Sequence, residues 1–203
     1  MKSLLLFATT NYGKYKILKE YVGEQINIQW FNQNNNIIES SDALDNASRK
    51  AIYASKLAEA TCISNDDSLW FTDFNASNQP SASIYRHIQD QHSDKNIIEY
   101  YQKLFLDKGI KETTAMITSI YAIAFQGNLI NHYKCSYEFL FKIPSSQCHE
   151  IGMPLSAFHF VPYLNKYYSE LTSIEKHSIL TSQFGGLVLF IKKNLDNPAA
   201  FIR

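Results

Sequence analysis

Acidic side chains occur at two places where they could bind a metal ion beside a phosphate group. Asp66 and Asp67 follow a short apolar run at residues 62–64, and Glu39 closes an earlier polar loop. Carboxylate oxygens are hard ligands of the kind that Mg²⁺ takes alongside substrate phosphates. Asp and Ser also satisfy turn backbones by themselves, so the Asp-Asp-Ser sequence alone is more typical of a solvated turn. A phosphate site nearby would favour nucleotide chemistry.

A candidate phosphate site lies near the N-terminus, between an apolar run at residues 4–8 and a segment with helical spacing. The connecting residues are Ala8, Thr9, Thr10, Asn11, Tyr12, Gly13 and Lys14. A strand, a tight polar turn and a helix start would direct backbone N–H groups, hydroxyls and one ammonium group toward a common point, which suits an anion. Such junctions are also common in α/β proteins without any ligand, so this turn alone leaves a structural role open.

The surrounding elements must position these groups. Residues 4–8 form a predicted buried strand, and the helix after the turn ends at Gly23. A half-buried strand is predicted over residues 26–31, and a long helix extends from an N-cap at Asp42 to Ala60, with Lys50 on it. A short strand at residues 62–64 then places residues 65–68 at its carboxyl end, where α/β sheets present ligand groups.

The rest of the chain predicts further helices and one long β-hairpin. Ser93 or Asp94 caps a helix that ends near Gly109, and Thr172 begins a last helical region with capping-box spacing. Residues 114–125 and 129–142 are rich in β-formers, and the Gln-Gly-Asn sequence at 126–128 favours a hairpin turn. The pattern indicates the α/β class, with a single domain over residues 1–203.

Composition narrows the classes of partner. Lys plus Arg and Asp plus Glu both count 19 in 203 residues, so no overall field attracts nucleic acid or an acidic membrane. Cys62, Cys135 and Cys148 lack the spacing of a zinc or redox site and are expected to be reduced thiols. The first apolar run is too short for a signal peptide, and no segment is long enough to cross a membrane. A cytoplasmic protein with a small-molecule substrate is expected.

Together these motifs resemble the inosine triphosphate pyrophosphatase family, which hydrolyses non-standard purine nucleoside triphosphates. Residues 8–14 are similar to its Ala-Thr-Gly-Asn-x-x-Lys loop, residues 45–51 to its Glu-Asn-Ala-x-x-Lys-Ala helix, and residues 65–69 to its Ala-Asp-Asp-Ser-Gly-Leu segment. Glu39 falls at the family's metal-binding Glu if one residue is deleted. Residues 80–86 keep the spacing of a Pro-Gly-x-x-Ser-Ala-Arg segment, and residues 170–176 resemble its Glu-Leu-Ser/Thr and Glu-Lys pairs.

The resemblance implies a fold, a reaction and a set of site residues. The fold would be an elongated mixed-sheet α/β structure with two lobes around a central cleft, assembled as a homodimer. A nucleoside triphosphate would be hydrolysed to monophosphate and pyrophosphate with Mg²⁺ held by Glu39 and Asp67. Asp67, or Asp66 beside it, would deprotonate the attacking water, while Lys14 and Lys50 neutralise phosphate charge. The implied substrate-binding residues are Thr9, Thr10, Asn11, Gly13, Lys14, Lys50, Ser68, Arg86 and Lys176, the last of which could equally be a solvated helix-terminal lysine.

The chain departs from the family where the base would be read. Leu155 and Ser156 stand at the family's Tyr and Asp, and residues 180–182 are Leu-Thr-Ser where the family has Ser-His-Arg. Losing a carboxylate and a cationic donor should remove much of the hydrogen-bond discrimination between bases. Two functions therefore stay open: a pyrophosphatase with altered base choice, and a catalytically inactive nucleotide-binding or scaffold homologue.

Overall fold

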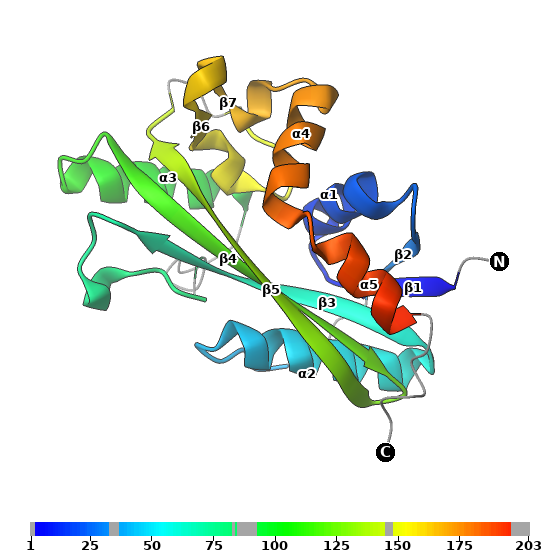
Figure 1. The fold of residues 1–203 in the computed structure, drawn as a ribbon. Coiled ribbons are helices and arrows are strands. Elements are labelled where there is room, and N and C mark those ends of the chain that lie inside the picture. The colour runs from blue at the N-terminus through cyan, green and yellow to red at the C-terminus, as the bar shows by residue number, and fades with distance from the viewer. Residues whose placement is uncertain (1–2, 33–36, 83, 85–92, 145–147, 196–203) are drawn as a thin grey trace.

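The structure is a computed structural model that describes residues 3–32, 37–82, 84, 93–144 and 148–195. A mixed sheet and the helices around it form the molecule (Figure 1). In chain order the strands and α-helices are β1 (Leu4–Ala8), α1 (Tyr12–Val22), β2 (Asn27–Phe31), α2 (Ala43–Ala58), β3 (Thr61–Phe71), α3 (Asp94–Asp107), β4 (Glu112–Phe125), β5 (Asn128–Lys142), β6 (His159–Val161), β7 (Lys166–Tyr167), α4 (Ser173–Phe184) and α5 (Leu187–Leu195).

The sheet has the strand order β2-β1-β3-β4-β5-β6-β7. β1 pairs in parallel with β2 and β3, and each later pairing is antiparallel. Parallel strands joined by α1 and α2, followed by a long antiparallel section, make a mixed α/β sheet. The predicted fold class is confirmed.

β3 continues through Asp66 and Asp67 instead of ending before them. It pairs with β4 along its whole length, from Thr61 to Phe71. The prediction of a short strand at residues 62–64, with the Asp pair at its carboxyl end, is therefore wrong. Eleven residues of β4, from Ala115 to Phe125, pair with β3. Partners from other elements neutralise the two carboxylates, which makes a mid-strand position tolerable. Because β1 pairs with β3 only as far as Ile63, both aspartates lie just beyond the parallel part of the sheet.

The β4–β5 hairpin gives the molecule its length. The turn residues Gln126 and Gly127 have φ values of 47° and 81°, the left-handed conformations that a type I′ turn requires. The predicted hairpin is confirmed, and its long arms cross the whole elongated molecule in Figure 1.

Helices cover both faces of the sheet (Figure 1). The small residues Ala47 and Ala51 let α2 pack closely on one face of β4. On the other face, α1, α4 and α5 bury a first apolar cluster that includes Ile63, whereas α3 buries a second that includes Leu69 and Phe71. Successive side chains of a strand alternate between faces, so Asn65 and Asp67 lie between these two clusters on the same face.

Local capping signals in the sequence agree with the observed helix ends. Asp42 caps α2, Ser93 caps α3, and Thr172 forms a capping box with Glu175 at the start of α4. A glycine pair at residues 185–186 separates α4 from α5. In the described part of the chain, no helix is both long and apolar enough to span a bilayer.

Candidate active site

The turn between β1 and α1 is fixed by its own side chains. Asn11 Oδ1 accepts a hydrogen bond from the Lys14 backbone N–H at 3.2 Å, which caps α1, and Asn11 Nδ2 donates to the Gly152 carbonyl at 2.9 Å. Thr9 Oγ1 accepts from the Asn11 N–H at 3.1 Å. Both ends of the Asn11 side chain are therefore engaged in holding the turn. The N-terminus of α1, which favours anions, is presented next to it.

Gly13 is required by a close approach of two chain segments. A Cβ at Gly13 would lie 2.6 Å from the Ile151 carbonyl oxygen, and a Cβ at Gly152 would lie 2.9 Å from Asn11 Oδ1. Gly152 also has a φ of 77°, which glycine adopts without strain. These glycines join the turn to the segment before β6. The structure thus gives Gly13 a packing role at the predicted substrate turn.

Asp67 is held by three side chains from different elements. Lys14 Nζ lies 2.7 Å from Asp67 Oδ2, and the two side chains are about one-fifth exposed, at 20% and 18%. Ser119 Oγ donates to Asp67 Oδ1 at 2.6 Å, and Asn65 Nδ2 donates to the same oxygen at 3.1 Å. Ser119 stands directly opposite Asp67 in the β3–β4 ladder. The carboxylate therefore has one oxygen fixed by two neutral donors and the other paired with an ammonium group.

These contacts decide the protonation state of Asp67. Burial alone would raise its pKa, but the charge and hydrogen bond of Lys14, the hydrogen bond from Ser119 and the charge of Lys50 together lower the pKa below its ordinary value. Asp67 is therefore an anion at neutral pH.

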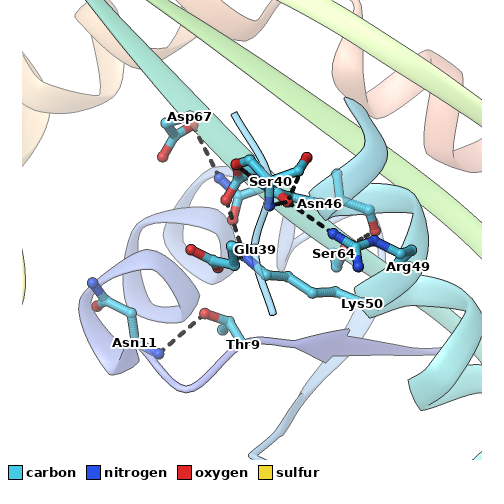
Figure 2. A network of polar contacts seen from close by, with 12 residues as sticks. Thr9, Asn11, Glu39, Ser40, Asn46, Arg49, Lys50, Ser64 and Asp67 are labelled. Atoms are coloured by element: carbon cyan, nitrogen blue, oxygen red, sulfur yellow. Dashed lines mark hydrogen bonds and ion pairs between the residues drawn. The ribbon is translucent and has the colours of Figure 1, made fainter. Parts of the chain in front are cut away.

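Asp66 points to the opposite face of the sheet, toward α2. Lys50 Nζ donates to Asp66 Oδ1 at 2.9 Å and also pairs with Glu39, while Asn46 Nδ2 donates to Asp66 Oδ2 at 2.9 Å. Asn46 is fully buried and also accepts from the Ser40 N–H at 2.7 Å. The segment carrying Glu39 is thereby tied to α2 and β3, and in the view of Figure 2 Glu39 and Lys50 lie between β3 and the turn carrying Thr9 and Asn11.

The site is a compact set of three carboxylates and two lysines. Glu39, Asp66 and Asp67 are balanced by Lys14 and Lys50, which leaves one excess negative charge. Within the described ranges, no group of three or more His, Cys, Asp or Glu side chains is arranged to hold a metal ion. Each of the three acidic residues predicted to act in catalysis or metal binding contacts a lysine.

The remaining predicted substrate residues lie in several parts of the structure. Thr10 is exposed beside the turn, and Ser68 lies on the face of β3 opposite Asp67 because strand side chains alternate. Lys176 forms an ion pair with Glu150 and lines a polar cavity of about 80 Å³ that Gly13 also lines. Arg86 lies outside the described residues.

An apolar cavity lies on the same face of the sheet as Asp67. It has a volume of about 80 Å³, and its apolar lining includes Ile17, Ile117, Phe139, Leu155, Leu180 and Phe184. Ile117 pairs with Leu69, one step along the ladder from the Asp67–Ser119 pair on that face. His159 also lines the cavity, and burial lowers its pKa to about 4, so it is neutral at physiological pH. The two segments that depart from the family pattern thus meet in one apolar cavity, through Leu155 and Ser156 of one and Leu180 of the other.

Three residues that hold the acidic groups were not predicted as site residues. Asn46 belongs to a motif that the sequence displays, and its spacing from Lys50 could have revealed it. Asn65 is two residues from Asp67 and would have followed from a strand that continues through both, whereas Ser119 could have been found only from the strand register, because it is 52 residues from Asp67. No local pattern in a single sequence specifies that pairing.

Comparison with known proteins identifies the family. A model of the Ham1 family matches residues 5–181 of the chain. The chain belongs to the Ham1 family. A sequence comparison with curated proteins finds no match. The resemblance to the inosine triphosphate pyrophosphatase family is confirmed at the level of family and fold.

Solved structures share the Ham1 fold at low sequence identity. A HAM1 protein from Coxiella burnetii has a TM-score of 0.71 and 18% identity, covering 95% of this chain and 100% of that one. The Ham1 protein of Staphylococcus aureus has a TM-score of 0.64 and 18% identity, covering 94% and 98%. A nucleoside-triphosphatase, or dITP/XTP pyrophosphatase, from Mycobacterium abscessus has a TM-score of 0.61 and 16% identity, covering 92% and 98%.

Proposed function

We propose that this Ham1-family protein is a Mg²⁺-dependent pyrophosphatase that hydrolyses a nucleoside triphosphate to monophosphate and pyrophosphate. Ham1 membership supports a nucleotide pyrophosphatase activity in general. The observation that carries the proposal is the placing of Lys14 and Lys50 on buried carboxylates next to the N-terminus of α1. Two ammonium groups and a helix N-terminus suit a polyphosphate, and the carboxylates supply a base.

Lys14 and Lys50 would each exchange an aspartate partner for a phosphate oxygen when substrate binds. Without nucleotide, each neutralises an aspartate of β3. A triphosphate at the turn offers a stronger concentration of negative charge, so we propose that both ammonium groups pair with its oxygens. Thr9, Thr10 and the first N–H groups of α1 would contact the same phosphates.

Glu39 and Asp67 would hold the Mg²⁺ ion. Their oxygens are the hard donors that Mg²⁺ prefers, and the site carries one excess negative charge before substrate arrives. The Glu39 side chain is 39% exposed, which leaves room for the water ligands that Mg²⁺ retains. The ion would neutralise charge on the phosphates during the reaction.

Asp67 is a better candidate for the general base than Asp66. It shares a face with the apolar cavity, whereas Asp66 faces α2. When Lys14 turns to phosphate, Asp67 Oδ2 loses its ammonium partner and can accept a hydrogen bond from water. Asp67 then takes a proton from water as the water oxygen bonds to phosphorus. The bond between the α-phosphate and the leaving pyrophosphate breaks in the same reaction.

We propose that the base pocket is altered and that the apolar cavity on the Asp67 face of the sheet receives part of the base. Its polar wall residue Ser156 already donates to the Met153 carbonyl at 2.6 Å and accepts from the Glu150 N–H at 2.8 Å. A base edge rich in hydrogen-bonding groups would therefore lose partners there. Non-standard purines that carry an apolar substituent should be favoured over hypoxanthine and guanine.

The test is pyrophosphate release from a panel of standard, deaminated and alkylated nucleoside triphosphates, with and without Mg²⁺. Asp67→Asn should abolish turnover, while Asp73→Asn, an exposed aspartate after the same strand, should leave it unchanged. A folded Asp67→Asn variant with full activity would refute the assignment of the base. Binding of nucleotides without turnover would instead support the inactive homologue, which the loss of the family's base-reading residues favours.

The proposed homodimer rests on the family resemblance. Sedimentation velocity of the purified protein tests it, since a monomer across micromolar concentrations would contradict it. The cytoplasmic location and the absence of nucleic-acid and membrane partners also stay predictions from composition.

A further inference from the structure

Asn65 is a polar residue buried beside the proposed base. It precedes Asp67 by two positions in β3, so the two side chains share one face of the sheet. Only 7% of Asn65 is exposed, and its Nδ2 donates to Asp67 Oδ1 at 3.1 Å. The related family motif has Ala at this position, so the amide is a feature of this chain. Its position next to Asp67 calls for a functional explanation.

The other end of the Asn65 amide has no hydrogen-bond partner in the described part of the chain. Asn65 Oδ1 is buried, and no donor among the described residues bonds to it. The amide cannot be reversed to relieve this, because its oxygen would then face the Asp67 carboxylate. A buried carbonyl oxygen without a donor is costly, and native structures rarely leave one so. The arrangement therefore points to a donor that arrives from outside the protein.

The contacts of Asp67 indicate where that donor lies. Oδ1 of Asp67 already accepts from both Ser119 and Asn65, so a reacting water, like the Mg²⁺ ion proposed above, must approach from the side of Oδ2, where Lys14 lies without substrate. A water molecule has two protons. One can be given to Asp67, and the second needs an acceptor close by on the same face.

We propose that Asn65 positions the attacking water in the hydrolysis assigned above, a role that rests on the proposed function. Its Nδ2 fixes the orientation of the Asp67 carboxylate, and its Oδ1 accepts a hydrogen bond from the proton that the water keeps. Asp67 takes the other proton while the water oxygen forms its bond to phosphorus and the bond to pyrophosphate breaks. Asn65 neither gains nor loses a proton.

Asn65→Ala tests this role against a matched control. Ser64→Ala also removes a buried hydrogen bond from β3, but Ser64 faces α2 and donates to the Ala47 carbonyl. We expect kcat of Asn65→Ala to fall about 10- to 100-fold, as small misplacements of reacting groups do, with KM for the nucleotide unchanged. Ser64→Ala should keep the parent kcat even where its thermal midpoint falls as far as that of Asn65→Ala.

Each outcome of the measurement decides the proposal. An Asn65→Ala variant with kcat within twofold of the parent would overturn the role of Asn65 and leave the pyrophosphatase assignment intact. A rise in KM with kcat unchanged would also overturn it, since Asn65 would then serve binding. A parent without turnover on the whole panel overturns both. Asn65→Ser fits the same space and retains an acceptor oxygen, so it should keep more activity than Asn65→Ala. If Asn65→Ala does not fold, Asn65→Ser is measured against the parent in its place.

Discussion

Replacing Lys14 with Met tests whether one ammonium group holds Asp67 as a buried anion. The two side chains form an ion pair with a distance of 2.7 Å between Lys14 Nζ and Asp67 Oδ2, and they are 20% and 18% exposed, respectively. Removing one member of a buried ion pair costs about 3–5 kcal/mol, because the other charge stays buried. Asn65 and Ser119 still donate to Asp67, and the pair is partly solvated, so we expect Lys14→Met to lower the free energy of unfolding by about 2–3 kcal/mol at pH 7.

The loss should depend on pH with a definite sign. The pKa of Asp67 is lowered in the folded parent, so its stabilising contribution is present above the unfolded value of 3.8 and is lost as the pH falls through the folded pKa. In Lys14→Met, only the hydrogen bond from Ser119 and the charge of Lys50 still oppose the effect of burial, so the pKa of Asp67 rises relative to the parent. At acidic pH the Asp67 carboxylate of the variant becomes protonated, and the free-energy cost of keeping its charge buried without Lys14 disappears. The difference between parent and variant is therefore largest at neutral pH and shrinks toward acidic pH.

Urea unfolding followed by the fluorescence of Trp30 and Trp70 measures this difference at several pH values. Lys16→Met is the control, because Lys16 lies in the same helix but is 52% exposed and no closer than 3.8 Å to its carboxylate partners. Exposed pairs of this kind contribute about 0–1 kcal/mol. Equal losses for the two variants at neutral pH would refute the buried-pair reasoning, as would a loss in Lys14→Met that does not change with pH.

Three further substitutions test other parts of the structure. Gly152→Ala should lower the free energy of unfolding more than Gly109→Ala, since both glycines have positive φ but only at Gly152 would a Cβ meet another atom, 2.9 Å from Asn11 Oδ1; equal losses in urea would contradict this. His159→Gln should flatten the fall in stability from pH 6.5 to pH 4, because the parent's buried His159, with its pKa lowered to about 4, does not take the proton that the unfolded chain takes; thermal midpoints across this range show whether the slopes differ. Asn46→Ala should cost about 1–3 kcal/mol by leaving buried polar groups unpaired; a neutral result in urea unfolding would show that water replaces the amide.

The sequence was sufficient for elements whose signals are local. The first strand, the helix after it and the caps at Asp42 and Thr172 follow from residues that contact each other within one turn. The hairpin at Gln126 was also predictable, since its turn type is set by the conformations of two adjacent residues. Each of these needs only a few neighbouring residues to specify it.

The course of β3 could not be predicted in the same way. Two adjacent aspartates argue against a strand interior unless their partners are known. Those partners are Lys14, Lys50 and Ser119, which lie 53, 16 and 52 residues away from the aspartates that they contact and are brought together only by the fold. Charge pairing between distant elements overrides the local preference for a turn here, and no periodicity in the chain reports it.

The continuous strand makes the two aspartates chemically distinct, which a turn would not have done. In a strand, Asp66 and Asp67 must point to opposite faces, so each meets a lysine from a different helix. Asp66 is enclosed by α2, and its two oxygens are taken by Lys50 and Asn46. Asp67 lies on the face that also carries Asn65 and the apolar cavity, with one oxygen bound only by an exchangeable ammonium group in the contacts described above. The strand conformation that was not predicted from sequence therefore encloses Asp66 between Lys50 and Asn46 and leaves Asp67 for the proposed base chemistry.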